Sequence, residues 1–212
     1  MNLRFKTWAF ARTPRTTRHR TSAPYILFLC LQFPLFFPVV FFPARLLAQS
    51  KAPSEYELKA AFLFNFAKFV EWPSSAFINP QSPFLICVLG TDPFGSALDD
   101  ALLHRSIQGR PAALLRIKHV SDIIGCQILF VPSSESHRLP EITVKLRGQC
   151  VLVIGESENF ASSGGVIQFS LEENRIRFLI NTDAADRSGL KFSSKLLALA
   201  KIVRDSPTGG SS

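Results

Sequence analysis

The chain has 212 residues, of which 47% are hydrophobic, a composition that favours a folded domain with a core and excludes an intrinsically disordered protein. The formal net charge is +8. Its source is the first 48 residues, which contain seven of the 24 Lys and Arg residues and no Asp or Glu. The remaining 164 residues therefore carry 17 basic and 16 acidic side chains. Such a nearly neutral body lacks the basic surface that nucleic-acid binding requires, so no nucleic-acid partner is expected.

Residues 1–48 have the order of features found in an export signal. Six basic residues come first, an apolar run follows at residues 25–42, and Ala48 offers a cleavage site, although Leu46 stands where a small residue is preferred. The alternative is an uncleaved membrane anchor, because the apolar run approaches the roughly 20 residues that span a bilayer. Pro34 and Pro38 lie within the run and disfavour a spanning helix. The sequence therefore predicts a cleaved signal peptide over residues 1–48 and a periplasmic protein.

The residues after this leader alternate between expected helices and strands. The first helix is expected over residues 55–72, where Ser54 and Glu57 have the spacing of a capping box and Pro73 ends the helix. Apolar runs bounded by Gly and Pro predict the elements that follow. In chain order they are a strand at 84–89, a helix at 92–103 that begins with Asp92 and Pro93, a turn at Gly109 and Pro111, strands at 112–117 and 126–131, a helix at 134–146 and a strand at 150–155.

The C-terminal part of the chain predicts antiparallel structure. Residues 166–171 and 175–180 alternate apolar and polar side chains around a short polar turn, which is the pattern of a β-hairpin. A final amphipathic helix is expected over residues 193–203, followed by a disordered tail at 206–212. Together the elements predict one α/β domain over residues 49–205. We expect a three-layer sandwich with a mixed sheet, a C-terminal antiparallel hairpin and flanking helices.

Three cysteines remain once the leader has removed Cys30: Cys87, Cys126 and Cys150. There is no Cys-x-x-Cys motif, and an exported protein meets an oxidising compartment, so one disulfide and one free thiol are expected. Cys87 lies in the first core strand and Cys126 at the start of the third, within bonding range of each other if these strands are neighbours. We therefore predict a Cys87–Cys126 disulfide and a free Cys150. The alternative is two buried thiols.

The sequence contains no catalytic motif that is complete. Residues 90–97 have the spacing of a phosphate-binding loop, but Ser96 stands where the loop needs Lys. Ser157 has the position of a nucleophile-elbow serine, but Asn159 replaces the second Gly of that motif. Other histidines and acidic pairs lack the spacing of a metal or catalytic site: His104, His119, His137, Asp99 with Asp100, and Glu172 with Glu173. We therefore predict that the protein is not an enzyme and binds neither a metal nor a cofactor.

The first expected helix carries more aromatic side chains than one buried face requires. They are Phe62, Phe64, Phe66, Phe69 and Trp72. Aromatic residues concentrate in the cores of protein interfaces, so part of this helix is expected to contact a partner or a second copy of the chain. The candidates are Phe62, Phe66, Phe69 and Trp72. The alternative is a helix that lies entirely within the core.

Seven segments between residues 56 and 200 resemble, in the same order, those of one known family. They are YELKAAFLFNFAKFVEWP, FLICVLGTDPFG, QGRP, CQILFV, NFASSGGVIQF, RIRFLIN and GLKFSSKLLALA. By these segments the chain resembles the YfiR family. The residues of the family motifs singled out here are Asn65, Gly109, Phe160, Gly165, Phe178, Asn181, Gly189, Ser193 and Ser194.

The resemblance implies a periplasmic α/β protein, often a homodimer, that binds the periplasmic sensing domain of an inner-membrane diguanylate cyclase. It would hold that enzyme inactive and so lower cyclic-di-GMP and surface attachment. The resemblance also implies release by redox state or by an outer-membrane lipoprotein, although this chain lacks the cysteines for the second disulfide that some members contain. Two other functions remain open. One is a periplasmic ligand-binding or accessory module of another membrane sensor, such as a histidine kinase, and the other is an exported enzyme on the same fold.

The leader generates a first prediction. The mature protein is expected to begin near Gln49 and to be found in the periplasmic fraction, because the basic, apolar and Ala-containing segments occur in the order that signal peptidases require. N-terminal sequencing of the protein from that fraction checks this. A full-length product in the inner membrane would show that the leader is an anchor.

Overall fold

The structure, a computed structural model, describes residues 52–206, so the expected signal peptide and nearly all of the expected tail lie outside the described residues. The helices are α1 (Glu55–Phe69), α2 (Ala97–Leu102), α3 (Leu139–Lys145), α4 (Thr182–Arg187) and α5 (Ser194–Leu197), with 3₁₀ turns η1 (Ser74–Ala76), η2 (Val120–Asp122) and η3 (Ser133–Arg138). The strands are β1 (Val70–Glu71), β2 (Phe84–Leu89), β3 (Ser106–Ile107), β4 (Arg110–Ile117), β5 (Ile128–Val131), β6 (Leu152–Gly155), β7 (Ile167–Glu172), β8 (Arg175–Asn181), β9 (Lys191–Phe192) and β10 (Lys201–Val203).

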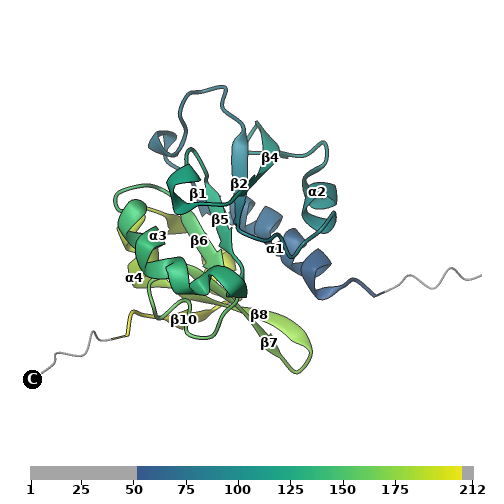
Figure 1. Cartoon of the computed structure of the whole chain (residues 1–212), viewed down its shortest axis with the longest axis vertical. Helices are drawn as coiled ribbons and strands as arrows, with labels where there is room; N and C mark the ends of the chain where they lie inside the picture. Colours follow the sequence, from purple (N-terminus) through teal and green to yellow (C-terminus); the bar gives the residue numbers. More distant parts are fainter. Residues whose placement is uncertain (1–51, 207–212) are drawn as a thin grey trace, which may run out of the picture. The chain divides into compact units, whose positions relative to one another are not determined.

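One mixed sheet forms the centre of the domain. Its eight strands have the order β10-β8-β7-β6-β5-β2-β4-β3. The strands from β4 to β7 run parallel, whereas β8 is antiparallel to β7 and β3 is antiparallel to β4. Helices α1 and α2 cover one face, and α3 and α4 cover the other (Figure 1). The three layers confirm the predicted α/β sandwich with a mixed sheet.

Helix α1 has the predicted start and a different end. Ser54 and Glu57 form the expected capping box. The helix ends at Phe69, not at Trp72, because Val70 and Glu71 are extended and pair with β9 in a separate two-stranded antiparallel sheet. The prediction of a continuous helix over residues 55–72 is therefore wrong in its last turn. The local sequence does not indicate strand β1, because its partner strand, β9, lies about 120 residues further along the chain.

Three other predicted helices are shorter than expected. Helix α2 begins at Ala97, because Asp92 Oδ1 accepts a hydrogen bond from the Phe94 N–H (2.7 Å) and forms a turn instead of a helix cap. The helix expected at 134–146 divides into η3 and α3, and Pro140 lies in the first turn of α3. The helix expected at 193–203 is wrong: only α5 is helical, and β10 then pairs in parallel with β8 at the edge of the sheet.

The turns around the sheet follow the local sequence. The predicted hairpin is confirmed as β7 and β8, joined by Glu173 and Asn174 with φ of 50° and 60°, the two positive values that a type I′ turn requires. The strand expected at 112–117 starts earlier, at Arg110, because a two-residue strand, β3, pairs antiparallel with it across Gln108 and Gly109. Pro111 therefore lies within a strand, opposite the short edge strand.

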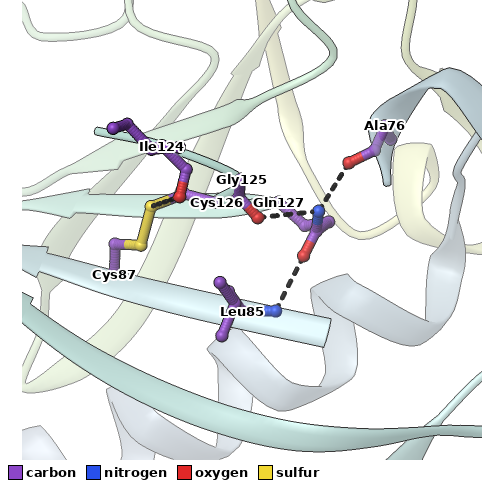
Figure 2. Close-up of a disulfide and its surroundings, with 7 residues drawn as sticks. All are labelled: Ala76, Leu85, Cys87, Ile124, Gly125, Cys126 and Gln127. Atoms are coloured by element: carbon purple, nitrogen blue, oxygen red, sulfur yellow. Dashed lines mark hydrogen bonds between the residues drawn. A yellow bond between two sulfur atoms is a disulfide. The ribbon is translucent and has the colours of Figure 1, made fainter. Parts of the chain in front are cut away.

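A disulfide joins β2 to the residues just before the neighbouring strand β5. Cys87 in β2 and Cys126 just before β5 are bonded, with their Cα atoms 6.0 Å apart, which confirms the predicted pairing and leaves Cys150 as a free thiol. Beside them the buried Gln127 side chain accepts a hydrogen bond from the Leu85 N–H (2.7 Å) and donates to the Ala76 carbonyl (2.6 Å) (Figure 2). The covalent bond and the amide thus hold β5 against β2 and η1.

The disulfide generates a second prediction. It closes a loop with a sequence separation of 39 residues, so the chain-entropy model predicts a loss of about 3–4 kcal/mol of unfolding free energy in the Cys87→Ala/Cys126→Ala double variant. Urea denaturation followed by circular dichroism measures this. The control is Cys150→Ala, for which we expect a loss of about 1 kcal/mol or less. Alkylation of the native wild type should label one thiol, and labelling of three thiols would contradict the disulfide.

Candidate functional site

The aromatic side chains of α1 divide between the core and the surface. Phe66 is 1% exposed and packs against Phe169 and Phe178 of the hairpin, so it is a core residue, which is a correction to its place among the interface candidates. Trp72 is half-buried, with its Nε1 donating to the Ala67 carbonyl at 2.9 Å. Phe69 is 39% exposed. Phe62 is half-buried at the boundary between core and surface.

The outward side chains of α1 form one wall of an apolar groove, here called the α1–α5 groove. Its volume is about 190 Å³, and it is lined by Phe62, Asn65, Phe66, Phe69, Phe178, Lys195, Leu196 and Leu199. Leu199, just after α5, is 73% exposed. On α1 the exposed Leu58 continues the line of Phe62, Asn65 and Phe69 at helical spacing. An apolar stripe of this kind, open to solvent, is typical of a surface that binds another protein.

The N-terminal half of α1 is fixed by a buried ion pair. Lys59 Nζ lies 2.5 Å from Glu156 Oε2, and the two side chains are only 6% and 8% exposed. The same ammonium contacts Glu55, and the Tyr56 hydroxyl donates to Glu156. Glu156 directly follows β6, so this cluster attaches α1 to the end of a central strand. Burial lowers the pKa of Lys59, but its hydrogen bonds to Glu156 and Glu55 outweigh burial and leave that pKa raised.

The C-terminal end of α1 is fixed by the segment that contains α5. Val70 pairs with Phe192, and the Ser193 N–H donates to the Phe69 carbonyl at 3.0 Å. The Ser193 side chain also caps α5 by accepting a hydrogen bond from the Leu196 N–H. One residue therefore joins the last turn of α1 to the first turn of α5. This contact places Phe69 beside Leu196, and so it shapes the α1–α5 groove.

Most of the family-motif residues support the fold and do not line the groove; Asn65 and Phe178 are the exceptions. The buried Phe160 ring packs so closely on Gly155 and Gly165 that a Cβ atom at either glycine would overlap it. Asn181, fully buried, accepts from the Ala184 N–H and donates to the Ala161 carbonyl and to Asp205. Gly109 and Gly189 lie in turns with positive φ, and Ser194 is the first residue of α5.

A second, polar cavity lies on the α3 and α4 side of the sheet, where the sequence predicted no site. Its volume is about 520 Å³, and Arg147, Ser162, Ser163, Arg187 and Asp205 are among its lining residues. Arg187 binds the Asp205 carboxylate through Nη1 and Nη2. This contact raises the pKa of Arg187 and lowers that of Asp205, to which Asn181 also donates. No motif could have identified the cavity, because its walls come from several short segments spread between residues 143 and 206.

The rejected nucleophile-elbow serine does face a cavity. Ser157, Glu158 and His137 all line a cavity of about 330 Å³ near η3. Within residues 52–206, however, no hydrogen bond connects His137 to Ser157, so the arrangement of a nucleophile beside a base is not formed. Nor does any group of three or more His, Cys, Asp or Glu side chains in the described part of the chain have the geometry to hold a metal ion.

The comparison with known families shows to which family this chain belongs. The model of the YfiR/HmsC-like family matches residues 56–201, which is more than half of the chain and almost all of the described domain. The chain belongs to the YfiR/HmsC-like family. Proteins of this family are periplasmic regulators in cyclic-di-GMP signalling, and the recognition made from the sequence segments is confirmed. Among the described residues, no helix is both long and apolar enough to cross a membrane.

Solved structures show only a distant likeness. The chain aligns with an ABC domain from Streptococcus pneumonia, solved in complex with L-Trp, at 10% identity and a TM-score of 0.46, covering 68% of this chain and 60% of that one. It also aligns with a ligand-free, open substrate binding protein with adhesive properties from Clostridium difficile, at 14% identity and a TM-score of 0.41, covering 58% and 55% of the two chains. In both cases the chain spans less than two thirds of the solved structure.

The contact between Arg187 and Asp205 generates a third prediction. The pKa of Asp205 is lower in the folded protein than in the unfolded chain, so its ionised carboxylate stabilises the folded state at neutral pH. This stabilisation is lost as the pH falls below about 4, where the carboxylate becomes protonated. Asp205→Asn should therefore unfold at a lower temperature than the wild type at pH 7, and the difference should shrink in acid. Thermal melts from pH 3 to 7 measure this, with the exposed Asp100→Asn as the control. A difference that does not change with pH would contradict the role of Asp205.

Proposed function

We propose that this protein binds the periplasmic sensing domain of a membrane-bound diguanylate cyclase and inhibits it, which lowers cyclic-di-GMP. The observation that supports this most directly is the α1–α5 groove. Two exposed apolar side chains, Phe69 and Leu199, line this groove, and the chain belongs to a family of regulators. Solvent-exposed apolar grooves are costly for a monomer and are typical of surfaces that a partner covers. The partner contact is therefore assigned to this face of α1.

An inhibitor of this kind acts through differential binding alone. It binds the inactive conformation of its partner more tightly than the active one. Moving a partner from almost fully active to almost fully inactive requires a preference of about 10⁴-fold, or roughly 5.5 kcal/mol. An interface of about 800 Å² per partner is large enough to supply this difference if much of it forms only in the inactive state. No catalytic group is needed for such a mechanism.

A substitution in the groove tests the proposal. Phe69→Glu places a charge where the partner should bury an apolar surface, so cyclic-di-GMP should rise to the level of a strain that lacks the gene. The matched control is Val144→Glu on α3, which changes a side chain that is 65% exposed on the opposite face of the sheet and should leave the nucleotide level at that of the wild type. Circular dichroism of both purified variants verifies that they fold.

The gene deletion sets the scale for this measurement. Loss of the protein should raise cyclic-di-GMP and surface attachment, and the complete chain should restore both, whereas a version without residues 1–48 should not. An unchanged nucleotide level in the deletion strain would contradict the proposal. So would a Phe69→Glu variant that folds and still represses as the wild type does.

A second candidate function is an accessory ligand-binding module of another membrane sensor, such as a histidine kinase. The observation in its favour is the polar cavity beside Arg187, because about 520 Å³ lies within the range of small-molecule sites. The deletion strain separates the two functions. An unchanged cyclic-di-GMP level together with an altered output of a histidine kinase would favour this candidate.

A further inference from the structure

We infer that the α1–α5 groove receives an amphipathic segment of the partner that inserts an apolar side chain beside Phe69 and places an acidic side chain against Lys195. The identity of the partner rests on the proposed function, whereas the chemistry of the segment rests on the groove. It follows from the size of the groove, its lining and its charge.

The size of the groove indicates a protein segment and not a free metabolite. Its volume of about 190 Å³ is below the range of roughly 300–1,000 Å³ that is typical of small-molecule sites. On α1 the partly exposed Leu58, Phe62 and Phe69 follow one another at helical spacing. A helix that presents apolar residues at positions i, i+3, i+4 and i+7 matches a groove of this kind, as in other helix-in-groove complexes. One apolar anchor would fill the space between Phe62, Phe69 and Leu199.

The charge of the groove indicates which charge should lie beside the apolar residues of that segment. Among the eight residues that line it, Lys195 carries the only charge, and Lys195 forms no ion pair with any described residue. An apolar lining with one lysine that has no ion pair is complementary to an apolar segment with an acidic flank.

The same charge disfavours a second copy of this chain as the occupant. A two-fold dimer places the same patch of both protomers against itself. Both Lys195 side chains would then lie in one interface, and none of the residues that line the groove is acidic to offset their charge. Like charges at an interface oppose association. If this protein is a homodimer, we expect another surface to form the dimer interface.

Two labelled helical peptides test this inference with the purified mature protein. Both present Leu and Phe at positions i, i+3, i+4 and i+7, and they differ only in flanking Glu or Lys residues. Fluorescence anisotropy at low salt should show that the acidic peptide binds more tightly than the basic one. Lys195→Glu should weaken the acidic peptide by about three- to fivefold and strengthen the basic one. Phe69→Glu should abolish binding of the acidic peptide.

Controls make each outcome decisive. Lys145→Glu changes an exposed lysine on α3, on the opposite face of the sheet, and should leave the peptide preference unchanged. Equal binding of the two peptides, no binding of either, or an equal effect of Lys145→Glu would overturn the inference. A dimer that Phe69→Glu dissociates in light scattering would assign the groove to a second copy. If the peptide preference holds while the deletion leaves cyclic-di-GMP unchanged, only the proposed function fails.

Discussion

The orientation of α1 depends on the buried ion pair between Lys59 and Glu156. Two charges that are more than nine-tenths buried are tolerated only while they stay paired, because an uncompensated buried charge costs several kcal/mol. The pair therefore prevents rotation of α1 about its axis at its N-terminal half, and the contact between Ser193 and Phe69 does the same at its C-terminal end. With both ends fixed, Leu63, Phe66 and Ala67 face the core. Phe62, Asn65 and Phe69 are left for the groove.

The remainder of the domain keeps this arrangement rigid. The hairpin strands β7 and β8 supply Phe169 and Phe178, on which α1 packs. Further along the sheet, beyond β6, the disulfide holds β2 against β5. A groove that is formed before the partner arrives loses less side-chain and backbone entropy on binding. This matters for the function proposed above, because an inhibitor that acts by binding draws its effect from the free energy of binding one conformation of its partner in preference to another.

Features set by neighbouring residues could be predicted from the sequence, whereas those set by distant partners could not. Strands β2, β5 and β6 are continuous apolar runs, and the hairpin shows its alternation and its turn. Strands β1, β9 and β10 have two or three residues each, and nothing local distinguishes them from the end of a helix. The periodicity of α1 also could not separate Phe66 from Phe69, since apolar residues occupy both faces of the helix. That choice depends on the ion pair of Lys59 with Glu156, which lies 97 residues further along the chain. The groove also needs α5, which was expected to be a longer helix.

The expected position of the cleavage site limits what the groove can reach. Residues 49–54 separate the end of the leader from the first residue of α1. In an uncleaved chain the apolar run would end at residue 42, and the 12 residues from 43 to 54 extend over at most about 40 Å. The start of α1 would then stay within that distance of the inner membrane. Under the proposed function, a tethered chain of this kind is confined to partners close to the inner membrane, whereas a released chain diffuses through the whole periplasm. Cleavage of the leader therefore determines how far from the inner membrane the groove can meet a partner.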